Sequence, residues 1–417
     1  VATAAAPDGA PASPRLRALL TQLHGGGDTH AFWQEIAAHG APLIEAGPAP
    51  DQRRVTFVWR GADTRNAQLM WPARSADPLS FQRLGRSDVW YRSMVLPSDT
   101  RLSYRIAVDV PAYGGDTGLT RRAALIGSAQ ADPLNPHRWG AAPGDSVQAY
   151  TSALVLPDAP PLPWSEAGAP VPAGRLMAAQ FASRLLGNTR QVTVYLPPGH
   201  RREGVAYPLM LLFDEDAYLR QVSTPAILDR LIAAGRIPPT VAVLIANPTR
   251  RSRADELPCN ARFADALADE LLPWVRAAYT AGQTPDAVVL AGSSYGGLAA
   301  ACGAFMRPDA FGKVLSMSGS FWWSPPAKAG QAPGSDEWLP AQYADAPRKP
   351  IAFYLTAGAM EHGVGADIGI LESTRHLGNV LRAKGYRVHA DVFAGGHDYI
   401  MWQGKLADGL ITLLGAP

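Results

Sequence analysis

Cysteine is scarce in this 417-residue sequence, and long apolar runs are missing. The two cysteines, Cys259 and Cys302, exclude a disulfide-rich scaffold and any four-cysteine metal site. One bridge between them is left open, and it would indicate an oxidising compartment. No run of about 18 apolar residues occurs, so the sequence predicts no membrane span.

Charge is also low. Charged side chains make up 18% of the residues and the formal net charge is +2, so no strong field for nucleic acid is expected. Lysine is rare, and the basic side chains are therefore almost all arginines, which suit planar, bidentate recognition of anions. We accordingly predict no nucleic acid partner and no resident metal ion.

Apolar residues, in contrast, make up 47% of the chain, enough for a large core at a length that suits two domains. The chain begins at Val1 with a stretch rich in Ala and Pro, as expected of a mature secreted chain whose signal peptide has been removed. Residues 157–173 are rich in proline, which predicts a semi-rigid linker. We therefore expect four parts: a flexible and helical segment (1–30), a β-sandwich domain (31–156), the linker (157–173) and an α/β domain (174–417).

Short β runs with alternating apolar and polar residues fill the first half of the chain. Gly, Pro and Asp turns separate them, and this pattern predicts an all-β sandwich of immunoglobulin-like size. The runs are 55–59, 68–71, 89–94 and 102–108. Helical spacing of leucines predicts a helix at 15–22 before the sandwich, and Phe32, Trp33 and Ile36 indicate a second short helix.

The second half alternates apolar strands with helical stretches. The expected strands are 177–181, 191–196, 209–213, 241–245, 287–291, 314–317, 351–356 and 388–393, and the expected helices include 263–275 and 374–383. Because the central strands are almost continuously apolar, we expect a mostly parallel, eight-stranded sheet that helices cover on both faces.

A candidate nucleophile lies where the fifth of these strands ends. Residues 287–300 read as a strand that passes through 292–296 (GSSYG) into a helix of small residues, which is the context of a nucleophile elbow. Ser294 would be the nucleophile, and the glycines at 292 and 296 leave room where a Cβ would collide with neighbouring elements. With this serine after the fifth strand, the pattern predicts the α/β-hydrolase fold.

The two partners of such a serine follow later strands, the acid before the histidine. His397, in the loop 395–398 (GGHD) after the last strand, is the predicted general base. Glu361 comes three residues after a glycine at the end of the seventh strand, where a carboxylate can stabilise the imidazolium. Asp367 is the competing acid, and a dyad without an acid is the other alternative.

Two backbone N–H groups are needed to stabilise an oxyanion. One is expected from Tyr295, at the helix N-terminus beside the nucleophile. The other is expected from Glu215 or Asp216, in the loop after the third strand. Since an acidic loop is electrostatically unfavourable beside an oxyanion, these side chains must point away or pair with arginine.

Candidate substrate-binding side chains follow two other strands at the same edge. Arg250 and Arg253 come after the fourth strand, and arginines there suit an anionic substrate. Trp322 and Trp323 follow the sixth strand, where their faces suit aromatic rings. Burial under the active-site loops is the alternative for the two tryptophans.

Several stretches of the chain resemble one family, the bacterial enterochelin (enterobactin) esterases. The resemblance rests on 131–136 (ADPLNP) with Trp139, 253–260 (RADELPCN), 292–298, 318–323 (SGSFWW) and 395–398 with Trp402. It extends over both halves of the chain, whereas an ordinary esterase would share the elbow and the histidine alone. The loop 214–216 lacks the glycine that family members have after the aspartate, and 359–362 (AMEH) lacks their Arg-Glu-Pro. These departures bear on the oxyanion geometry and on substrate preference.

The resemblance implies a serine esterase that acts on ferric triscatecholate siderophores, whose scaffold is a macrocyclic trilactone of serine units. Ser294 would attack a lactone carbonyl, and His397 would activate the water that hydrolyses the acyl-enzyme. Iron enters as part of the substrate, so no cofactor is implied. By the same resemblance, Arg250 and Arg253 would face the catecholate trianion.

Two rival functions stay open. A carbohydrate-ester or feruloyl-type esterase also joins an α/β-hydrolase to β modules, and a siderophore-binding protein could keep the pocket without the chemistry. The sequence leaves open the oligomeric state and the preferred form of siderophore, whether cyclic, linear or glucosylated. The family suggests cytoplasm or periplasm, and the Ala/Pro-rich start favours the periplasm.

Overall fold

The structure is a computed structural model that describes residues 10–75, 79–111, 118–140, 145–166, 168–326, 337–365 and 367–415, without the side chains of 118 and 119. The chain divides into two compact units. Unit 1 is Val1–Pro161 with Ala394–Asp398, and unit 2 is Leu162–Phe393 with Tyr399–Pro417. The division falls inside the predicted linker 157–173, while the domain boundaries themselves stay a prediction. The start of the expected flexible segment, residues 1–9, lies outside the described residues.

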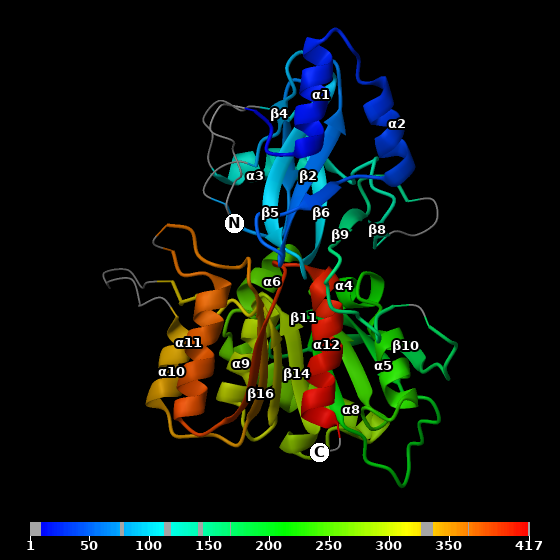
Figure 1. The fold of residues 1–417 in the computed structure, drawn as a ribbon. Coiled ribbons are helices and arrows are strands. Elements are labelled where there is room, and N and C mark those ends of the chain that lie inside the picture. Colours follow the sequence, from blue (N-terminus) through cyan, green and yellow to red (C-terminus); the bar gives the residue numbers. More distant parts are fainter. Residues whose placement is uncertain are drawn as a thin grey trace. The chain divides into compact units, whose positions relative to one another are not determined.

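Unit 1 begins with two helices and continues mainly as β-strands (Figure 1). The helices are α1 (Pro14–His24), α2 (His30–His39) and α3 (Gly118–Ser128). The strands are β1 (Leu43–Ala46), β2 (Gln52–Arg60), β3 (Ala67–Met70), β4 (Gln82–Arg83), β5 (Val89–Pro97), β6 (Arg101–Val108), β7 (Ala129–Gln130), β8 (Arg138–Trp139) and β9 (Thr151–Val155). Ser13 begins α1 because its hydroxyl accepts the N–H of Leu16, and Pro14 suits the first helical position.

Antiparallel pairing joins these strands into two sheets, of order β1-β2-β5-β4 and β3-β6-β9-β8, with β7 pairing to β6. The ring of Phe57 in β2 meets the ring of Tyr104 in β6 edge to face, with centroids 4.7 Å apart. Leu16 and Leu19 of α1 and Trp33 of α2 pack in a buried cluster with Val58 of β2. The apolar residues that predicted the two helices are therefore the ones that bury them.

Unit 2 alternates strands and helices. Its strands are β10 (Arg175–Ser183), β11 (Asn188–Leu196), β12 (Leu209–Phe213), β13 (Val241–Ile245), β14 (Val288–Ser293), β15 (Lys313–Met317), β16 (Ala352–Gly358) and β17 (Arg387–Phe393). Its helical segments are α4 (Glu215–Arg220), α5 (Thr224–Ala233), α6 (Arg250–Glu256), α7 (Ala261–Ala266), η1 (Leu267–Leu271, a π-helix), α8 (Leu272–Tyr279), η2 (Pro285–Ala287, a 3₁₀-helix), α9 (Tyr295–Met306), α10 (Trp338–Asp345), α11 (Ile370–Ala383) and α12 (Tyr399–Leu414).

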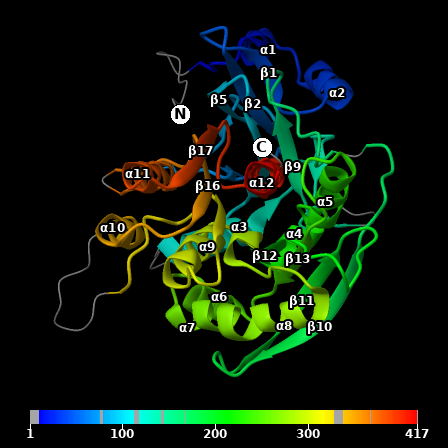
Figure 2. The same ribbon diagram turned by 90° about the horizontal axis from the view of Figure 1, so that it is seen from below.

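These strands form one sheet of order β10-β11-β13-β12-β14-β15-β16-β17. The first three pair antiparallel, and the pairs from β13 through β17 are parallel. Figure 2 shows helices on both faces, with α5 and α12 on one and α8, α9 and α11 on the other. Every residue of β12, β13 and β14 is buried, which explains their continuous apolar sequence.

The helix expected at 263–275 is interrupted. The structure divides this stretch into α7, the π-helical turn η1 and α8. Pro273 is the second residue of α8, and a proline cannot donate the hydrogen bond that would continue an α-helix through η1. Helical periodicity predicted the position of these segments but not this break.

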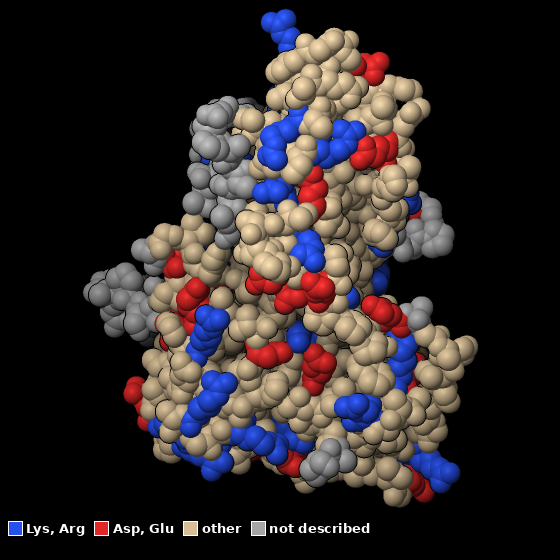
Figure 3. Space-filling model, viewed as in Figure 1, with Lys and Arg blue, Asp and Glu red and all other residues tan. Residues whose placement is uncertain are grey.

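A disulfide joins Cys259, in the turn after α6, to Cys302 in α9. It answers the question that the sequence left open. On the face displayed in Figure 3, basic and acidic side chains are interspersed in both units. Within the described part of the chain, no helix has the length and apolarity needed to cross a bilayer.

Candidate active site

Ser294 lies at the junction between β14 and α9. Its backbone has φ 57° and ψ −123°, a region that residues with a Cβ rarely adopt. Hydrogen bonds hold this conformation, because the Ser294 N–H donates to the Met317 carbonyl and the Ser294 carbonyl accepts the N–H groups of Leu298 and Ser320, each at 3.1 Å. Backbone strain that the surroundings maintain is typical of functional sites, and Ser294 is half-buried rather than enclosed.

The glycines around Ser294 explain how β14 and α9 can approach so closely. A Cβ on Gly292 would lie 2.6 Å from the carbonyl carbon of Gly296, so residue 292 has to be glycine. A Cβ on Gly297 would lie 2.5 Å from Ser316 Oγ. At Gly296 the nearest contact would be the Cβ of Phe213 at 3.3 Å, which is tight but less severe. Sequence reasoning named positions 292 and 296 and missed 297, where the packing is tighter than at 296.

Tyr295 is the first residue of α9, and the first N–H groups of an α-helix have no acceptor within the helix. The positive end of the helix dipole lies there as well. Both features suit an oxyanion beside Ser294. The role of the Tyr295 N–H as an oxyanion donor stays a prediction.

The acidic turn after β12 begins with Asp214, whose φ of 62° lies in the left-handed region. Its carboxylate accepts two hydrogen bonds from Arg253, Nε to Oδ1 at 2.6 Å and Nη2 to Oδ2 at 2.8 Å, and one from Asn247 at 2.6 Å. Burial lowers the pKa of Arg253, but the hydrogen bonds and the charge of Asp214 outweigh it and raise that pKa above its ordinary value. Arg253 therefore pairs with the charge of Asp214. A contact of Arg253 with the substrate stays a prediction.

The other two acidic side chains of this turn are also engaged. Glu215 is buried, and its Oε1 accepts hydrogen bonds from the hydroxyl of Thr193 and from Gln191 at 3.2 Å, both in β11. Asp216 forms an exposed ion pair with Arg220 one turn later in α4. All three carboxylates thus have partners, as an oxyanion site requires. Whether Glu215 or Asp216 supplies a backbone N–H to the oxyanion stays a prediction.

Glu361 follows β16 and is 7% exposed. Its Oε2 accepts two hydrogen bonds at 2.6 Å, one from the backbone N–H of Gly358 and one from the hydroxyl of Ser318. The indole N–H of Trp402 in turn donates to Ser318 Oγ at 2.9 Å. The competing acid, Asp367, is exposed in the loop that precedes α11. Glu361 is therefore the buried one of the two carboxylates.

His397 lies in the loop Ala394–Asp398, which joins β17 to α12 and groups with unit 1. Within that unit, the His397 N–H donates to the Pro72 carbonyl at 2.6 Å, and Oδ2 of Asp398 accepts the Ser103 N–H at 2.5 Å. The loop is thus anchored at the histidine and at the residue that follows it.

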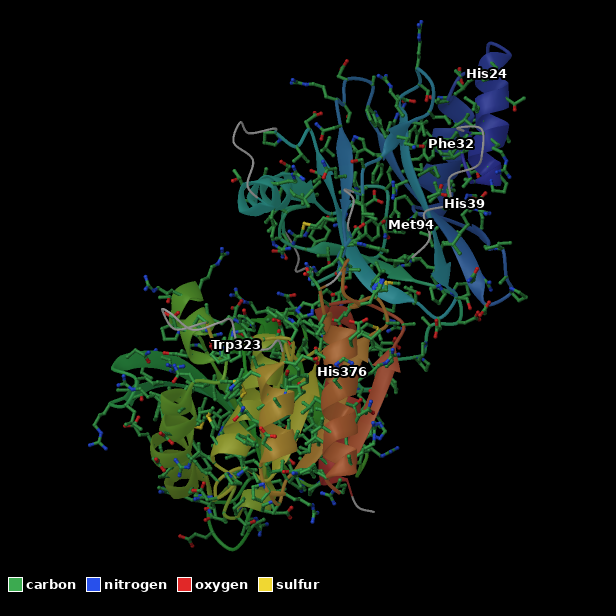
Figure 4. The ribbon with its side chains drawn as sticks, turned by 90° about the vertical axis from the view of Figure 1, so that its left-hand side faces the viewer. His24, Phe32, His39, Met94, Trp323 and His376 are labelled. Carbon is green, nitrogen blue, oxygen red and sulfur yellow. A yellow bond between two sulfur atoms is a disulfide. The ribbon has the colours of Figure 1, made fainter. Side chains whose placement is uncertain are left out.

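Two other histidines of unit 2 have different surroundings. His376 lies on α11 (Figure 4), where its Nδ1 is 2.8 Å from the carboxylate of Glu337. His389, in β17, stacks on Tyr354 with ring centroids 5.2 Å apart. Neither follows the last strand, where the fold places a base.

The side chains proposed for substrate binding differ in exposure. Arg250 is exposed at the first position of α6, and Trp322 is 38% exposed. Trp323, labelled in Figure 4, is half-buried and meets Trp338 edge to face at 6.3 Å. Burial, the alternative for the two tryptophans, therefore applies in part to Trp323. The ring of Trp322 is the more exposed of the two.

The side chain of Tyr295 was not anticipated as part of the site. The guanidinium of Arg253 lies 5.9 Å from its ring centroid, and the Trp322 ring lies 6.3 Å from it on a tilted plane. Arg253, Tyr295 and Trp322 therefore form a row at the edge where β13, β14 and β15 end. The elbow motif sets no requirement at position 295, so the sequence carried no signal for it.

Among the described residues, no group of three or more His, Cys, Asp and Glu side chains is placed to hold a metal ion. The chemistry available at the strand ends is a strained serine, a helix N-terminus, a fixed carboxylate and exposed aromatic and cationic side chains. Such an arrangement suits acyl transfer.

Family models match both halves of the chain. The Esterase model matches residues 183–413, and the model described as "Enterochelin esterase, N-terminal" matches residues 54–165. The first alone spans more than half of the chain.

Individual relatives agree with these models. The iron(III) enterobactin esterase of Dickeya dadantii is 33% identical, with 92% of each chain covered. The iron(III) salmochelin esterase of an Escherichia coli strain is 29% identical, covering 92% of this chain and 93% of its own. A crystal structure of the Shigella flexneri enterobactin esterase in the presence of enterobactin has a TM-score of 0.71 at 28% identity, covering 92% of this chain and 97% of that one.

Proposed function

The chain belongs to the enterochelin (enterobactin) esterase family, and from that premise we propose that it hydrolyses the ester bonds of ferric enterobactin-type siderophores. The observation that carries this proposal is the conformation of Ser294, a strained serine between a buried parallel strand and a helix N-terminus. The likeness to the Shigella esterase extends over both units, which supports the siderophore over a carbohydrate ester as substrate.

The finer fold supports the same chemistry. We propose that unit 2 is an α/β-hydrolase fold, because β12 and β13 exchange places in its sheet and the serine follows the fifth strand. We also propose that unit 1 is an immunoglobulin-like sandwich, supported by its two antiparallel sheets and by the Phe57–Tyr104 ring contact.

In the proposed reaction, Ser294 Oγ bonds to a lactone carbonyl carbon while His397 accepts the hydroxyl proton. The tetrahedral oxyanion accepts one hydrogen bond from the backbone N–H of Tyr295 and another from that of Glu215 or Asp216. Collapse breaks the bond to the serine oxygen of the trilactone, which takes the proton from His397. Water then attacks the acyl-enzyme by the same route and leaves a carboxylate.

The assignment of the acid and the base rests on the order of the chain. Phe393, the last residue of β17, pairs with Gly358, the last residue of β16, and accepts the Ala359 N–H at 2.8 Å. Glu361 and His397 each follow these ends within four residues. The ends of adjacent parallel strands lie at the same edge of a sheet, and this order supports the assignment.

Substrate recognition is assigned to side chains exposed at that edge. Arg250 would face the catecholate trianion, and Trp322 would stack on a catechol ring. Arg253 would instead brace the turn through its ion pair with Asp214. Iron belongs to the substrate, and hydrolysis releases it because three catecholates on separate products bind iron less tightly than three on one scaffold.

The compartment is proposed to be the periplasm. The Cys259–Cys302 disulfide supports an oxidising environment. Cell fractionation with thiol titration of the purified protein tests this. A cytoplasmic protein with two free thiols would contradict it.

Product analysis tests the function. Wild-type protein is incubated with ferric and with iron-free enterobactin. The products are separated and identified by mass spectrometry. We expect linear catecholoyl-serine fragments from wild type and none from Ser294→Ala. Tight binding without products would favour a siderophore-binding protein, and faster cleavage of methyl ferulate than of enterobactin would favour a feruloyl-type esterase.

A further inference from the structure

The turn after β15 contacts both the nucleophile and the candidate acid. At one end, the Ser320 N–H donates to the Ser294 carbonyl at 3.1 Å. At the other, the Ser318 hydroxyl donates to Glu361 Oε2 at 2.6 Å. Ser318 is itself fixed, since its N–H donates to the Thr356 carbonyl at 2.7 Å. Three residues therefore connect the strand ends that carry Ser294 and Glu361.

The direction of the Ser318 proton follows from its neighbours. An indole N–H can only donate, so Ser318 Oγ accepts from Trp402 and its single hydroxyl proton is left for Glu361. The Gly358 N–H donates to the same oxygen, so Glu361 Oε2 has two donors. The carboxylate cannot rotate to exchange its oxygens without breaking both hydrogen bonds.

Burial makes this chain of hydrogen bonds stiff. Ser318 is 0% exposed and Trp402 is 2% exposed, so water does not compete for the hydroxyl. Ser318 also has a φ of 49°, in the left-handed region. Such a conformation costs free energy and persists where neighbouring contacts enforce it, often at functional sites.

We infer that Ser318, with its hydroxyl oriented by Trp402, is a positioning residue that holds the carboxylate of Glu361 in one orientation for catalysis. The inference rests on the proposed role of Glu361 as the triad acid. It adds a function for the turn at 318–320, which precedes the two tryptophans proposed to bind substrate.

The test is a double-mutant cycle that combines Ser318→Ala with Glu361→Gln, assayed on ferric enterobactin and on p-nitrophenyl butyrate. Ser318→Ala should lower kcat about ten- to a hundredfold on both esters and leave KM nearly unchanged, because a hydrogen bond to a charged group is lost away from the bound substrate. In the Glu361→Gln background the same change should cost less than about threefold. Equal losses in both backgrounds would show a merely structural role and overturn the inference.

Two further variants serve as a control and as a second test. Ser316→Ala is the matched control, because Ser316 is a buried serine of β15 whose Oγ has no hydrogen-bond partner among the described residues. Its kcat should match that of wild type. Trp402→Phe keeps an aromatic ring and removes the N–H, so it should lower kcat several-fold. It takes the place of Ser318→Ala as the test if that variant does not fold. An unchanged kcat in Trp402→Phe would overturn the orienting role.

Failure of the proposed function has a different signature. If Glu361→Gln keeps full activity on both esters, the triad assignment is wrong and the positioning role falls with it. If p-nitrophenyl butyrate is cleaved and enterobactin is not, the substrate assignment is wrong, and the cycle on the small ester still decides the role of Ser318.

Discussion

Two acidic turns at the same edge of the sheet differ in the groups that donate hydrogen bonds to their carboxylates. Asp214, after β12, is held by the guanidinium of Arg253 through two hydrogen bonds and by Asn247 through a third. Glu361, after β16, receives hydrogen bonds on Oε2 from neutral donors, the Ser318 hydroxyl and the Gly358 N–H.

This difference indicates a structural role for the charge of Asp214 and a catalytic role for the charge of Glu361. A bidentate arginine cancels the charge of its carboxylate and fixes the loop that carries it. Neutral donors stabilise an ionised carboxylate without cancelling it, so its field remains available to an imidazolium. We therefore expect the Asp214 turn to contribute mainly to stability and the Glu361 turn mainly to kcat.

Removing the nucleophile sets the scale for this comparison. Ser294→Ala should lower turnover by about 10⁴-fold or more, while ferric enterobactin binding stays within a few-fold, because Oγ bonds to the substrate only during acyl transfer. Steady-state kinetics and fluorescence titration measure the two quantities. Residual turnover near wild type would show that the elbow serine is not the nucleophile.

Removing the charge of Glu361 should cost nearly as much. Glu361→Gln is expected to lower kcat about 10²- to 10⁴-fold, since the imidazolium loses its charge partner and its preferred tautomer. The melting temperature should hardly change, because the amide still fills the same space. Asp367→Asn is the matched control and should be mild. A larger loss in Asp367→Asn would make Asp367 the acid.

The disulfide belongs to the structural side of the comparison. It joins the turn after α6, which carries Arg253, to α9, which follows Ser294, across a separation of 43 residues. Replacing both cysteines with alanine should lower the free energy of unfolding by roughly 4 kcal/mol in the chain-entropy account. Urea unfolding measures this. Stability equal to wild type would indicate that the bridge does not form in solution.

The smallest effects are expected from replacing Arg253 and Arg250, and the two replacements should give contrasting results. Arg253→Met leaves the buried Asp214 charge poorly compensated, so stability should fall by roughly 2–3 kcal/mol. Cleavage of ferric enterobactin and of p-nitrophenyl butyrate should then fall in parallel. Arg250→Met should instead raise KM about tenfold for ferric enterobactin alone. A selective loss of ferric enterobactin in Arg253→Met would mean that Arg253 is a substrate ligand after all.

The strands of unit 2 could be located from the sequence because burial on both faces leaves continuous apolar runs. The runs expected at 209–213 and 241–245 coincide with β12 and β13. Helix α3 went unnoticed, since glycines lie at its start and near its end. Patterns of apolar residues thus predict elements that are long or fully buried.

Contacts within the site were harder to foresee. The position of Ser294 follows from local turn chemistry, which a short motif encodes. The pairing of Arg253 with Asp214 depends on where β13 and β12 lie side by side, and no local pattern encodes that. Ser318 reaches Glu361 across 43 residues of sequence, so its role could be seen only once β15 and β16 were paired.

The contrast between the two acidic turns can be tested most directly by the rate at which a fluorophosphonate labels Ser294. This reaction requires an activated serine and no siderophore, so it reports on the catalytic residues alone. We predict that Glu361→Gln slows labelling by about 10²- to 10⁴-fold, as it slows kcat, while Arg253→Met stays within about tenfold of wild type well below its melting temperature. Equal slowing in the two variants, or a larger effect of Arg253→Met, would contradict the account.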